Sequence, residues 1–173
     1  MRLFIAAQLS DETKRSVKAV QDSFRKQKVS GNYTPQENLH ITLAFIGEYD
    51  DPEHVADVLA AVSFREFSVT MDRVGCFGDL WWTGFAEIGE LDSLAGKVRR
   101  ALAEGNIPFD RKRFKPHVTI LRKPEFYGGS VPKVEIEPAT MNITGISLMK
   151  SFRGRNGMIY TELAYVSAHN NDE

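Results

Sequence analysis

One short sequence pattern occurs twice, and it constrains the fold of this chain more than any other feature. It reads Leu39-His40-Ile41-Thr42-Leu43 in the first copy and Pro116-His117-Val118-Thr119-Ile120 in the second. Each copy alternates apolar and polar side chains over the length of a short strand, which is typical of a β-strand with one buried face. The chain has only 4 His, so two matched His-x-Thr pairs exceed what chance placement gives. If the two copies belong to two similar halves of the chain, each half presents one such strand.

Strand geometry gives the repeated pair a chemical meaning. Side chains alternate across a strand, so His40 and Thr42 point to one face and the apolar residues beside them to the other. His117 and Thr119 do the same in the second copy. If the two halves face each other across a cleft, two imidazoles and two hydroxyls meet. This set suits phosphate-ester chemistry, because one ring can accept a proton from water while the other donates one to a leaving oxygen. The hydroxyls can bind the remaining phosphate oxygens.

Two other interpretations of the histidines have less support. A single His-x-Thr pair is more often structural than catalytic, because threonine is a favoured strand residue, but two matched copies favour a site. A zinc site needs three or four ligands, and the remaining histidines, His54 and His169, fall in an expected helix start and in the C-terminal tail. Cys76 stands alone, which excludes a site made of several cysteines. We therefore expect neither a metal nor a cofactor.

The size and charge of the chain fit one ordinary domain. It has 173 residues with 22 Lys+Arg against 23 Asp+Glu, and this length allows one domain or two small, closely packed lobes. No apolar run approaches the roughly 20 residues that span a bilayer. The apolar start is too short for a signal peptide and runs at once into Asp11 and Glu12. We expect a cytoplasmic monomer, whose basic surface for any nucleic-acid partner must be local because the net charge is near zero.

Periodicity and capping residues predict the order of helices and strands. Helices are expected over residues 11–28, 52–62 and 91–105. Strands are expected over residues 3–8, 39–46, 67–71 and 81–88 and after residue 116, with a turn at 31–38 and a hairpin turn at 153–157. The last residues, 170–173, are expected to fray. This order favours an α+β fold with largely antiparallel sheets.

The residues around both motifs resemble a known family. Residues 35–48 (PQENLHITLAFIGE) closely resemble the first motif of the bacterial and archaeal RNA 2′,3′-cyclic phosphodiesterases, and residues 114–122 (FKPHVTILR) resemble their second. Residues 2–6 (RLFIA) are similar to the family's first strand. This family belongs to the two-histidine (2H) phosphoesterase superfamily. The resemblance implies that residues 1–173 form a single bilobal domain, an α+β pseudo-twofold fold with mostly antiparallel sheets lining a central cleft and helices outside. It also implies metal-independent hydrolysis of RNA 2′,3′-cyclic phosphate ends to a 2′-phosphate.

The resemblance further implies roles for five residues. His40 would donate a proton to the departing 3′-oxygen, and His117 would be the base that activates water. Thr42 and Thr119 would bind phosphate oxygens. Arg122 matches a family arginine that is well placed to bind the phosphate; the alternative is an exposed charge at the end of a strand. Strict alternation puts Arg122 on the face opposite His117, so a strand end or a bulge would have to re-aim it.

Basic and aromatic residues near the motifs are candidates for RNA contacts. Residues 111–115 (RKRFK) form a basic block just before the second motif, which is either a phosphate contact or a solvated face. Trp81 and Trp82 are adjacent, so we expect one in the core and the other free to stack on a base. The family often has a tryptophan just before the first motif, and here Tyr33 is the aromatic in that place.

Three hypotheses for the function remain open from the sequence. The leading one is hydrolysis of RNA 2′,3′-cyclic phosphate ends. The second keeps this chemistry on 2′-5′-linked oligonucleotides, a small cyclic nucleotide or the cyclic phosphate of ADP-ribose from tRNA splicing. The third is a non-catalytic RNA-binding module, which binding without turnover would support. The acid and base roles of the two histidines rest on the resemblance, because the motifs are nearly equivalent.

Overall fold

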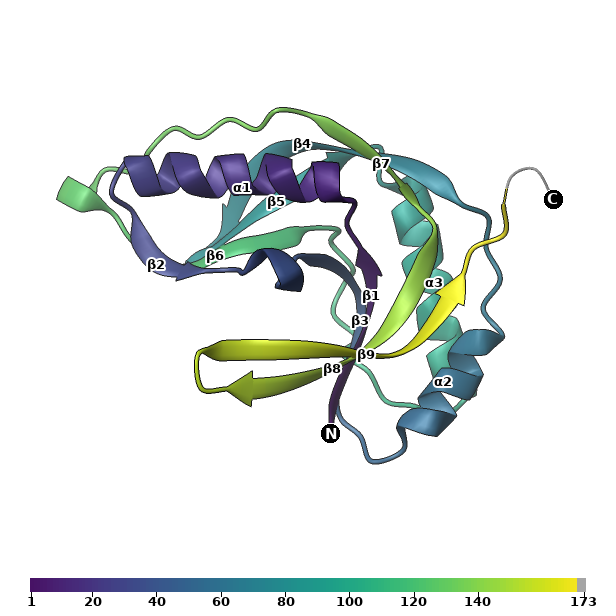
Figure 1. Cartoon of the computed structure of the whole chain (residues 1–173). Coiled ribbons are helices and arrows are strands. Elements are labelled where there is room, and N and C mark those ends of the chain that lie inside the picture. The colour runs from purple at the N-terminus through teal and green to yellow at the C-terminus, as the bar shows by residue number, and fades with distance from the viewer. Residues whose placement is uncertain (171–173) are drawn as a thin grey trace.

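Two antiparallel β-sheets form the framework of the structure (Figure 1), a computed structural model that describes residues 1–170. The first sheet has the strand order β3-β1-β8-β9. Its strands are β1 (Arg2–Gln8), β3 (His40–Glu48), β8 (Gly145–Gly154) and β9 (Gly157–Ser167). The expected hairpin turn joins β8 to β9. The fraying expected at the C-terminus falls mainly on residues 171–173, which lie outside the described range.

The second sheet has the strand order β2-β6-β5-β4-β7. Its strands are β2 (Ser30–Tyr33), β4 (Phe67–Phe77), β5 (Leu80–Ala86), β6 (Val118–Glu125) and β7 (Ala139–Ile143). Strand β2 lies partly where the sequence predicted a turn. It is an edge strand with no buried residue, so no apolar alternation marks it in the sequence.

Three helices cover the sheets within residues 1–170, namely α1 (Asp11–Lys26), α2 (Pro52–Ala60) and α3 (Gly89–Glu104). The first two begin at the predicted capping residues. Ser10 Oγ accepts a hydrogen bond from the Thr13 amide at 3.2 Å, and Asp51 Oδ1 accepts one from the His54 amide at 3.1 Å. Such caps satisfy amides that have no partner within the helix.

A strand–helix–strand unit occurs twice in the chain. The first copy is β1, α1 and β3, the second is β5, α3 and β6, and each long helix has 16 residues. In both copies the last strand pairs antiparallel with the first. One His-x-Thr pair falls at the beginning of each last strand. This repeat confirms the duplicated, pseudo-twofold α+β fold that the sequence analysis predicted.

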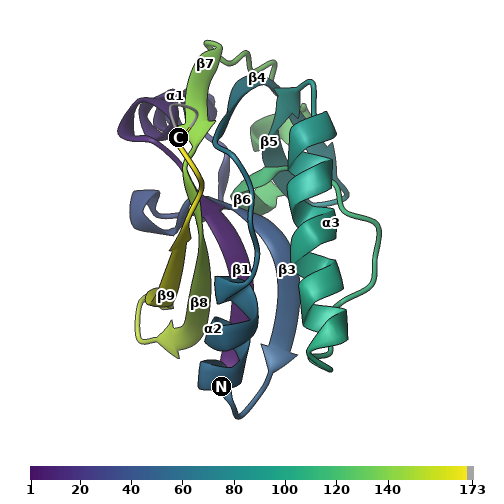
Figure 2. The ribbon, with the colours of Figure 1, turned by 90° about the vertical axis from the view of Figure 1, so that its right-hand side faces the viewer.

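Each long helix packs on the sheet that holds the other copy's strands. Helix α1 contacts β6 and β7, while α3 contacts β3 and α2 contacts β9. Figure 1 shows α1 along the second sheet, and Figure 2 shows α2 and α3 in front of β1 and β3. One cluster of buried apolar residues joins the helix-covered faces of both sheets. The helices therefore lie outside and leave the opposite faces of the sheets for the His-x-Thr pairs.

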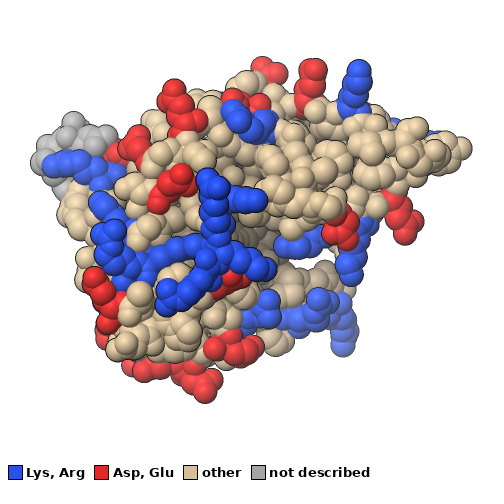
Figure 3. Space-filling view, turned by 180° about the vertical axis from the view of Figure 1, so that it is seen from behind, with Lys and Arg blue, Asp and Glu red and all other residues tan. Residues whose placement is uncertain are grey.

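The inner face of the first sheet carries a smaller apolar cluster. It consists of Phe4, Ala6 and Met149, with Phe45 and Tyr160 packed against it. Seen from behind, the molecule has an opening between its two halves, bordered by Lys and Arg side chains (Figure 3). No helix within residues 1–170 has the length and hydrophobicity that a membrane span requires.

Candidate functional site

The first His-x-Thr pair begins β3, directly after a short 3-10 helix (Gln36–Asn38). His40 Nδ1 lies 2.6 Å from the Asn38 carbonyl oxygen. Since a carbonyl can only accept, the ring donates its Nδ1 proton there, and Nε2 of the neutral ring accepts from the Thr42 hydroxyl at 2.8 Å. The Asn38 side chain is buried and donates to the Met158 carbonyl at 2.9 Å. The anchor of the His40 ring is therefore itself held by β9.

The second pair repeats this arrangement just before β6. His117 Nδ1 lies 2.6 Å from the Lys115 carbonyl oxygen, which is again two residues back along the chain. The neutral ring therefore has the same tautomer as His40, with Nε2 as its acceptor. Among residues 1–170, Thr119 makes no hydrogen bond to His117, unlike Thr42 to His40. In both motifs the backbone carbonyl two residues back thus anchors the imidazole. The motifs differ in that the threonine hydroxyl bonds to the ring in the first motif and not in the second.

A β-bulge follows each pair at the same position. In the first sheet Ala6 pairs with Thr42 and Ile5 with Ala44, so Leu43 is an extra residue. In the second sheet the corresponding pairs are Trp82 with Thr119 and Trp81 with Leu121, so Ile120 is the extra residue. Both extra residues and the residues after them are fully buried. The alternation of side chains therefore shifts by one after each bulge.

The bulge in β6 determines the direction of Arg122. Without it, Arg122 would share the helix-covered face with Val118. Because Ile120 and Leu121 both point into the core, Arg122 returns to the face of Thr119. The structure thus contains the bulge that the sequence analysis required for Arg122 to share a face with the second motif. The equivalent position in the first motif, five residues after the histidine, is Phe45.

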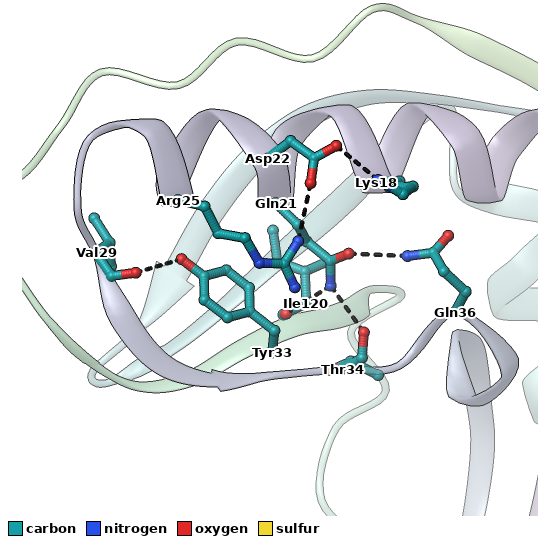
Figure 4. A network of polar contacts seen from close by, with 9 residues as sticks. All are labelled: Lys18, Gln21, Asp22, Arg25, Val29, Tyr33, Thr34, Gln36 and Ile120. Carbon is teal, nitrogen blue, oxygen red and sulfur yellow. Dashed lines mark hydrogen bonds and ion pairs between the residues drawn. The ribbon is translucent and has the colours of Figure 1, made fainter.

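Gln21 of α1 holds the bulge of the second motif (Figure 4). Its side chain is buried, and its Nε2 donates to the Ile120 carbonyl at 3.0 Å and to the Thr34 carbonyl at 2.9 Å. Its Oε1 accepts from Gln36 Nε2 at 2.9 Å. One side chain therefore links the bulge after His117 to the segment that leads into His40.

Arg99 of α3 makes the equivalent connection in the other half. Its Nε donates to the carbonyl of the bulge residue Leu43 at 3.2 Å, and its guanidinium donates to the Lys112 carbonyl at 2.8 Å. Arg99 and Gln21 occupy the same position, the eleventh, in their 16-residue helices. The amide of Asp110 adds a backbone bond to the Phe45 carbonyl at 2.8 Å. Each helix thus ties the bulge of one motif to the segment preceding the other.

The electrostatics of the first pair favour a neutral His40. Burial lowers the pKa of His40 below its ordinary value of 6.5, the Asn38 carbonyl opposes this shift, and the charge of His117 adds to it. The two imidazoles therefore lie within electrostatic reach of each other, although they belong to different sheets. Burial raises the pKa of Tyr160, whereas Arg122 and Arg2 oppose that shift. Groups of the second sheet thus act on β9 of the first.

Aromatic rings that the sequence analysis did not single out surround both histidines. Phe4 lies 4.9 Å from His40 and Tyr160 lies 5.3 Å from it, measured between ring centroids. The Phe77 ring lies edge-on to His117, with 5.6 Å between the ring centroids. On its other contact, Phe77 lies 5.1 Å from the Trp82 ring in a tilted arrangement. The three rings that contact the histidines, those of Phe4, Tyr160 and Phe77, come from β1, β9 and β4. Because they are far from the motifs in sequence, no local pattern could have found them.

The two adjacent tryptophans point to opposite faces, as expected. Trp81 packs in the core against Phe24 at 5.2 Å, while Trp82 pairs with Thr119 and shares its face. Tyr33 does not join that face. It pairs with the core residue Leu121, and its hydroxyl donates to the Val29 carbonyl at 2.6 Å. Cross-strand neighbours share a face of the sheet, so Tyr33 points toward α1, as Figure 4 shows.

A metal site does not emerge from the part of the chain that the structure describes. Within residues 1–170 no three His, Cys, Asp or Glu side chains gather closely enough to hold an ion. His54, the third histidine weighed above, instead contacts the Gly105 carbonyl at 2.7 Å through Nε2 and so connects α2 to the end of α3.

The family is decided by comparison with known sequences. A profile of the 2′-5′ RNA ligase superfamily matches residues 9–155, which include both His-x-Thr pairs. The chain belongs to the 2′-5′ RNA ligase superfamily. This is the two-histidine phosphoesterase superfamily that the motifs resembled.

Relatives of this chain within the superfamily match it over nearly its whole length. The RNA 2′,3′-cyclic phosphodiesterase of Archaeoglobus fulgidus is 32% identical over 94% of this chain and 98% of its own. The protein of the same name from Thermotoga maritima is 26% identical over 94% of this chain and 93% of its own. The crystal structure of apo LigT from Escherichia coli superimposes with a TM-score of 0.81, covering 96% of both chains at 23% identity. That likeness confirms the fold.

Proposed function

We propose that this protein hydrolyses the 2′,3′-cyclic phosphate at the end of an RNA to a 2′-phosphate, without a metal ion. The observation that carries the proposal is the pair of His-x-Thr motifs. Each has its imidazole anchored by a carbonyl two residues back, and each is followed by a β-bulge. The names of the relatives from Archaeoglobus fulgidus and Thermotoga maritima support the same substrate.

The proposed reaction is an in-line displacement at phosphorus. Nε2 of His117 accepts a proton from water, and the water oxygen forms a bond to phosphorus. The bond from phosphorus to the 3′-oxygen breaks, and this oxygen takes a proton from Nε2 of His40. The products are a 2′-phosphate and a free 3′-hydroxyl, after which a proton returns from His117 to His40 through solvent. Each histidine acts through the nitrogen that its backbone anchor leaves available.

The remaining residues of the proposed site stabilise charge on the phosphate. Thr42 and Thr119 donate hydrogen bonds to the non-bridging oxygens, and Arg122 binds them through its guanidinium. In the free protein, burial lowers the pKa of His40, which disfavours the protonated form that an acid needs. A bound phosphodiester carries a negative charge next to the ring and counteracts this effect. Binding of the anionic substrate thus favours the protonated form of His40.

The whole chain is proposed to work as one bilobal unit and as a monomer in the cytoplasm. Support for the single unit comes from the long helices, which pack across the two halves, and from Gln21 and Arg99, which bond to both motif-bearing segments. Separating the halves would leave the buried Gln21 amide and the partly exposed Arg99 guanidinium without these acceptors.

The proposal is tested with a short RNA that ends in a 2′,3′-cyclic phosphate, incubated with the protein and excess EDTA. Chromatography against synthetic 2′- and 3′-phosphate standards identifies the product. We expect the 2′-phosphate, with the rate unchanged by EDTA. A 3′-phosphate product would overturn the proposed leaving oxygen, and loss of turnover in EDTA would overturn the metal-independent mechanism. If the RNA is bound but not cleaved, a panel of 2′-5′-linked oligonucleotides, cyclic nucleotides and ADP-ribose cyclic phosphate separates another substrate from plain binding.

A further inference from the structure

Arg2 lies on the motif-bearing face of the first sheet, at the start of β1. Its neighbour Leu3 is fully buried toward the helices, while Phe4 belongs to the smaller cluster on the inner face. The Arg2 guanidinium carbon lies 4.9 Å from the centre of the Phe45 ring. Phe45 packs against that same inner cluster. Arg2 therefore contacts the same aromatic cluster whose member Phe4 lies against His40.

Phe45 stands where the other motif has Arg122. Both residues follow their histidine by five positions and come after equivalent bulges. The first sheet therefore lacks an arginine at this position, and Arg2 supplies a guanidinium directly above it. Along β1, Arg2 comes two residues beyond Phe4, the partner of Phe45, which is about 7 Å of strand. The cation of the first sheet is thus displaced away from the histidines compared with Arg122.

Arg2 forms no ion pair within the described residues. Its cross-strand partner Glu48 contacts the terminal ammonium of Met1, at 2.8 Å, which lowers the pKa of the Glu48 carboxylate, and the charge of Arg2 adds to this shift. Ser151, the partner of Arg2 on the other side, has a buried hydroxyl without a hydrogen-bond partner. A guanidinium without an ion pair, beside an unsatisfied hydroxyl, is suited to an anion.

We propose that Arg2 binds a second phosphate of the substrate, the phosphodiester that precedes the terminal nucleotide. This inference rests on the proposed function and narrows its substrate class to oligonucleotides, since a cyclic mononucleotide has no such group. The displacement by two strand residues places Arg2 beyond the reacting phosphate, toward a neighbouring one. Beyond Arg2, the β8–β9 hairpin carries Arg153 and Arg155, so positive charge continues in the direction in which the chain would run.

The charges around Tyr160 agree with this placement. Arg2 from the first sheet and Arg122 from the second both act to lower the pKa of its phenol. Charges from opposite sheets therefore act on the same phenol, and the Tyr160 ring contacts His40 edge-on at 5.3 Å. A substrate that spans Arg122 and Arg2 would pass this hydroxyl.

The test compares a cyclic mononucleotide with a dinucleotide that ends in the same cyclic nucleotide. We expect the wild-type protein to prefer the dinucleotide in kcat/KM, and Arg2→Gln to lower that preference about 10-fold, mainly through KM. Arg2→Lys should keep part of it, because a point charge remains. Lys150→Gln removes a neighbouring charge that is not on the inner face and should keep the full preference.

Three results would overturn the inference. One is an equal loss on both substrates in Arg2→Gln, which would place Arg2 at the reacting phosphate. The others are an unchanged preference in Arg2→Gln and a loss of preference in Lys150→Gln. If the wild-type protein hydrolyses neither substrate, the proposed function fails instead. The subsite is then judged by binding of a dinucleotide 2′-phosphate, whose affinity should fall about 10-fold in Arg2→Gln; equal affinity in both proteins would refute it.

Discussion

At the scale of single residues, the sequence revealed the motif positions because their information is local. The His-x-Thr pairs stand in short alternating segments, and the burial of Ile41 and Val118 follows that alternation. The direction of Arg122 was not predictable, because it depends on a bulge that only the pairing with β5 reveals. The rings of Phe4, Phe77 and Tyr160 were likewise hidden, since distant strands bring them to the histidines.

Arg122 gives a prediction about substrate binding. Arg122→Gln removes the guanidinium proposed to bind the phosphate, and hydrogen bonds to charged groups are worth about 1.5–3 kcal/mol. We expect kcat/KM on a cyclic phosphate RNA to fall about 10- to 100-fold, with a smaller loss in Arg122→Lys. The neighbouring Lys123→Gln serves as the matched control. Equal losses in Arg122→Gln and Lys123→Gln would contradict a specific role for Arg122.

His40 gives a prediction about stability and pH. Burial lowers its pKa in the folded state below the ordinary 6.5, so the folded protein binds fewer protons there than the unfolded chain. Stability then rises with pH across this range, and the free energy of unfolding should fall as pH drops below about 6.5. Urea unfolding at several pH values should show a weaker dependence in His40→Gln. An identical dependence in both proteins would show that His40 is not held neutral by the fold.

At the scale of elements, helices and their starts followed from the sequence, whereas their packing partners did not. The capping residues Ser10 and Asp51 are local signals, and both cap their helices as predicted. The crossing of α1 and α3 to the opposite sheets is a tertiary feature without a local pattern. For the same reason Gln21 and Arg99 read as ordinary helix residues, and only the structure shows that they hold the bulges.

Gln21 gives a prediction for a positioning residue. Gln21→Ala leaves the Ile120 and Thr34 carbonyls without their donor, which should cost about 1–3 kcal/mol of stability. Because the bulge aims Arg122, kcat/KM should also fall about 10- to 100-fold in protein that remains folded. Gln27→Ala, at the exposed end of the same helix, is the control. Loss of stability with unchanged kinetics in the folded fraction would reduce Gln21 to a structural residue.

At the scale of the whole molecule, the duplicated bilobal fold could be anticipated from the paired motifs and from the resemblance that they carry. The sequence analysis predicted that the two His-x-Thr faces meet only on the condition that the two halves face each other across a cleft. The overall charge of −1 hides the basic surface, because acidic residues elsewhere cancel it. Figure 3 shows Lys and Arg gathered over one face and around the opening. Charge distribution, unlike net charge, is set by the fold.

The basic block gives a prediction for the molecule's affinity for RNA. Arg111, Lys112 and Arg113 are exposed just before the second motif. If each contacts a phosphate, changing all three to Gln should flatten the plot of log affinity against log salt by about 2, at roughly 0.7 per phosphate on single strands. Fluorescence anisotropy with an RNA 2′-phosphate measures this slope. An unchanged slope would show that these three side chains are solvated and do not contact RNA phosphates.

The most direct test of the paired mechanism is a double-mutant cycle on turnover. His40→Ala and His117→Ala should each lower kcat on a cyclic phosphate RNA by about 10²–10⁴-fold, the range of general acid–base catalysis. Residues that act as one unit are not additive, so the double variant should lose little more than either single one. Circular dichroism confirms that each variant is folded. Substantial turnover in either single variant, or losses that multiply in the double one, would contradict a joint acid–base role of His40 and His117.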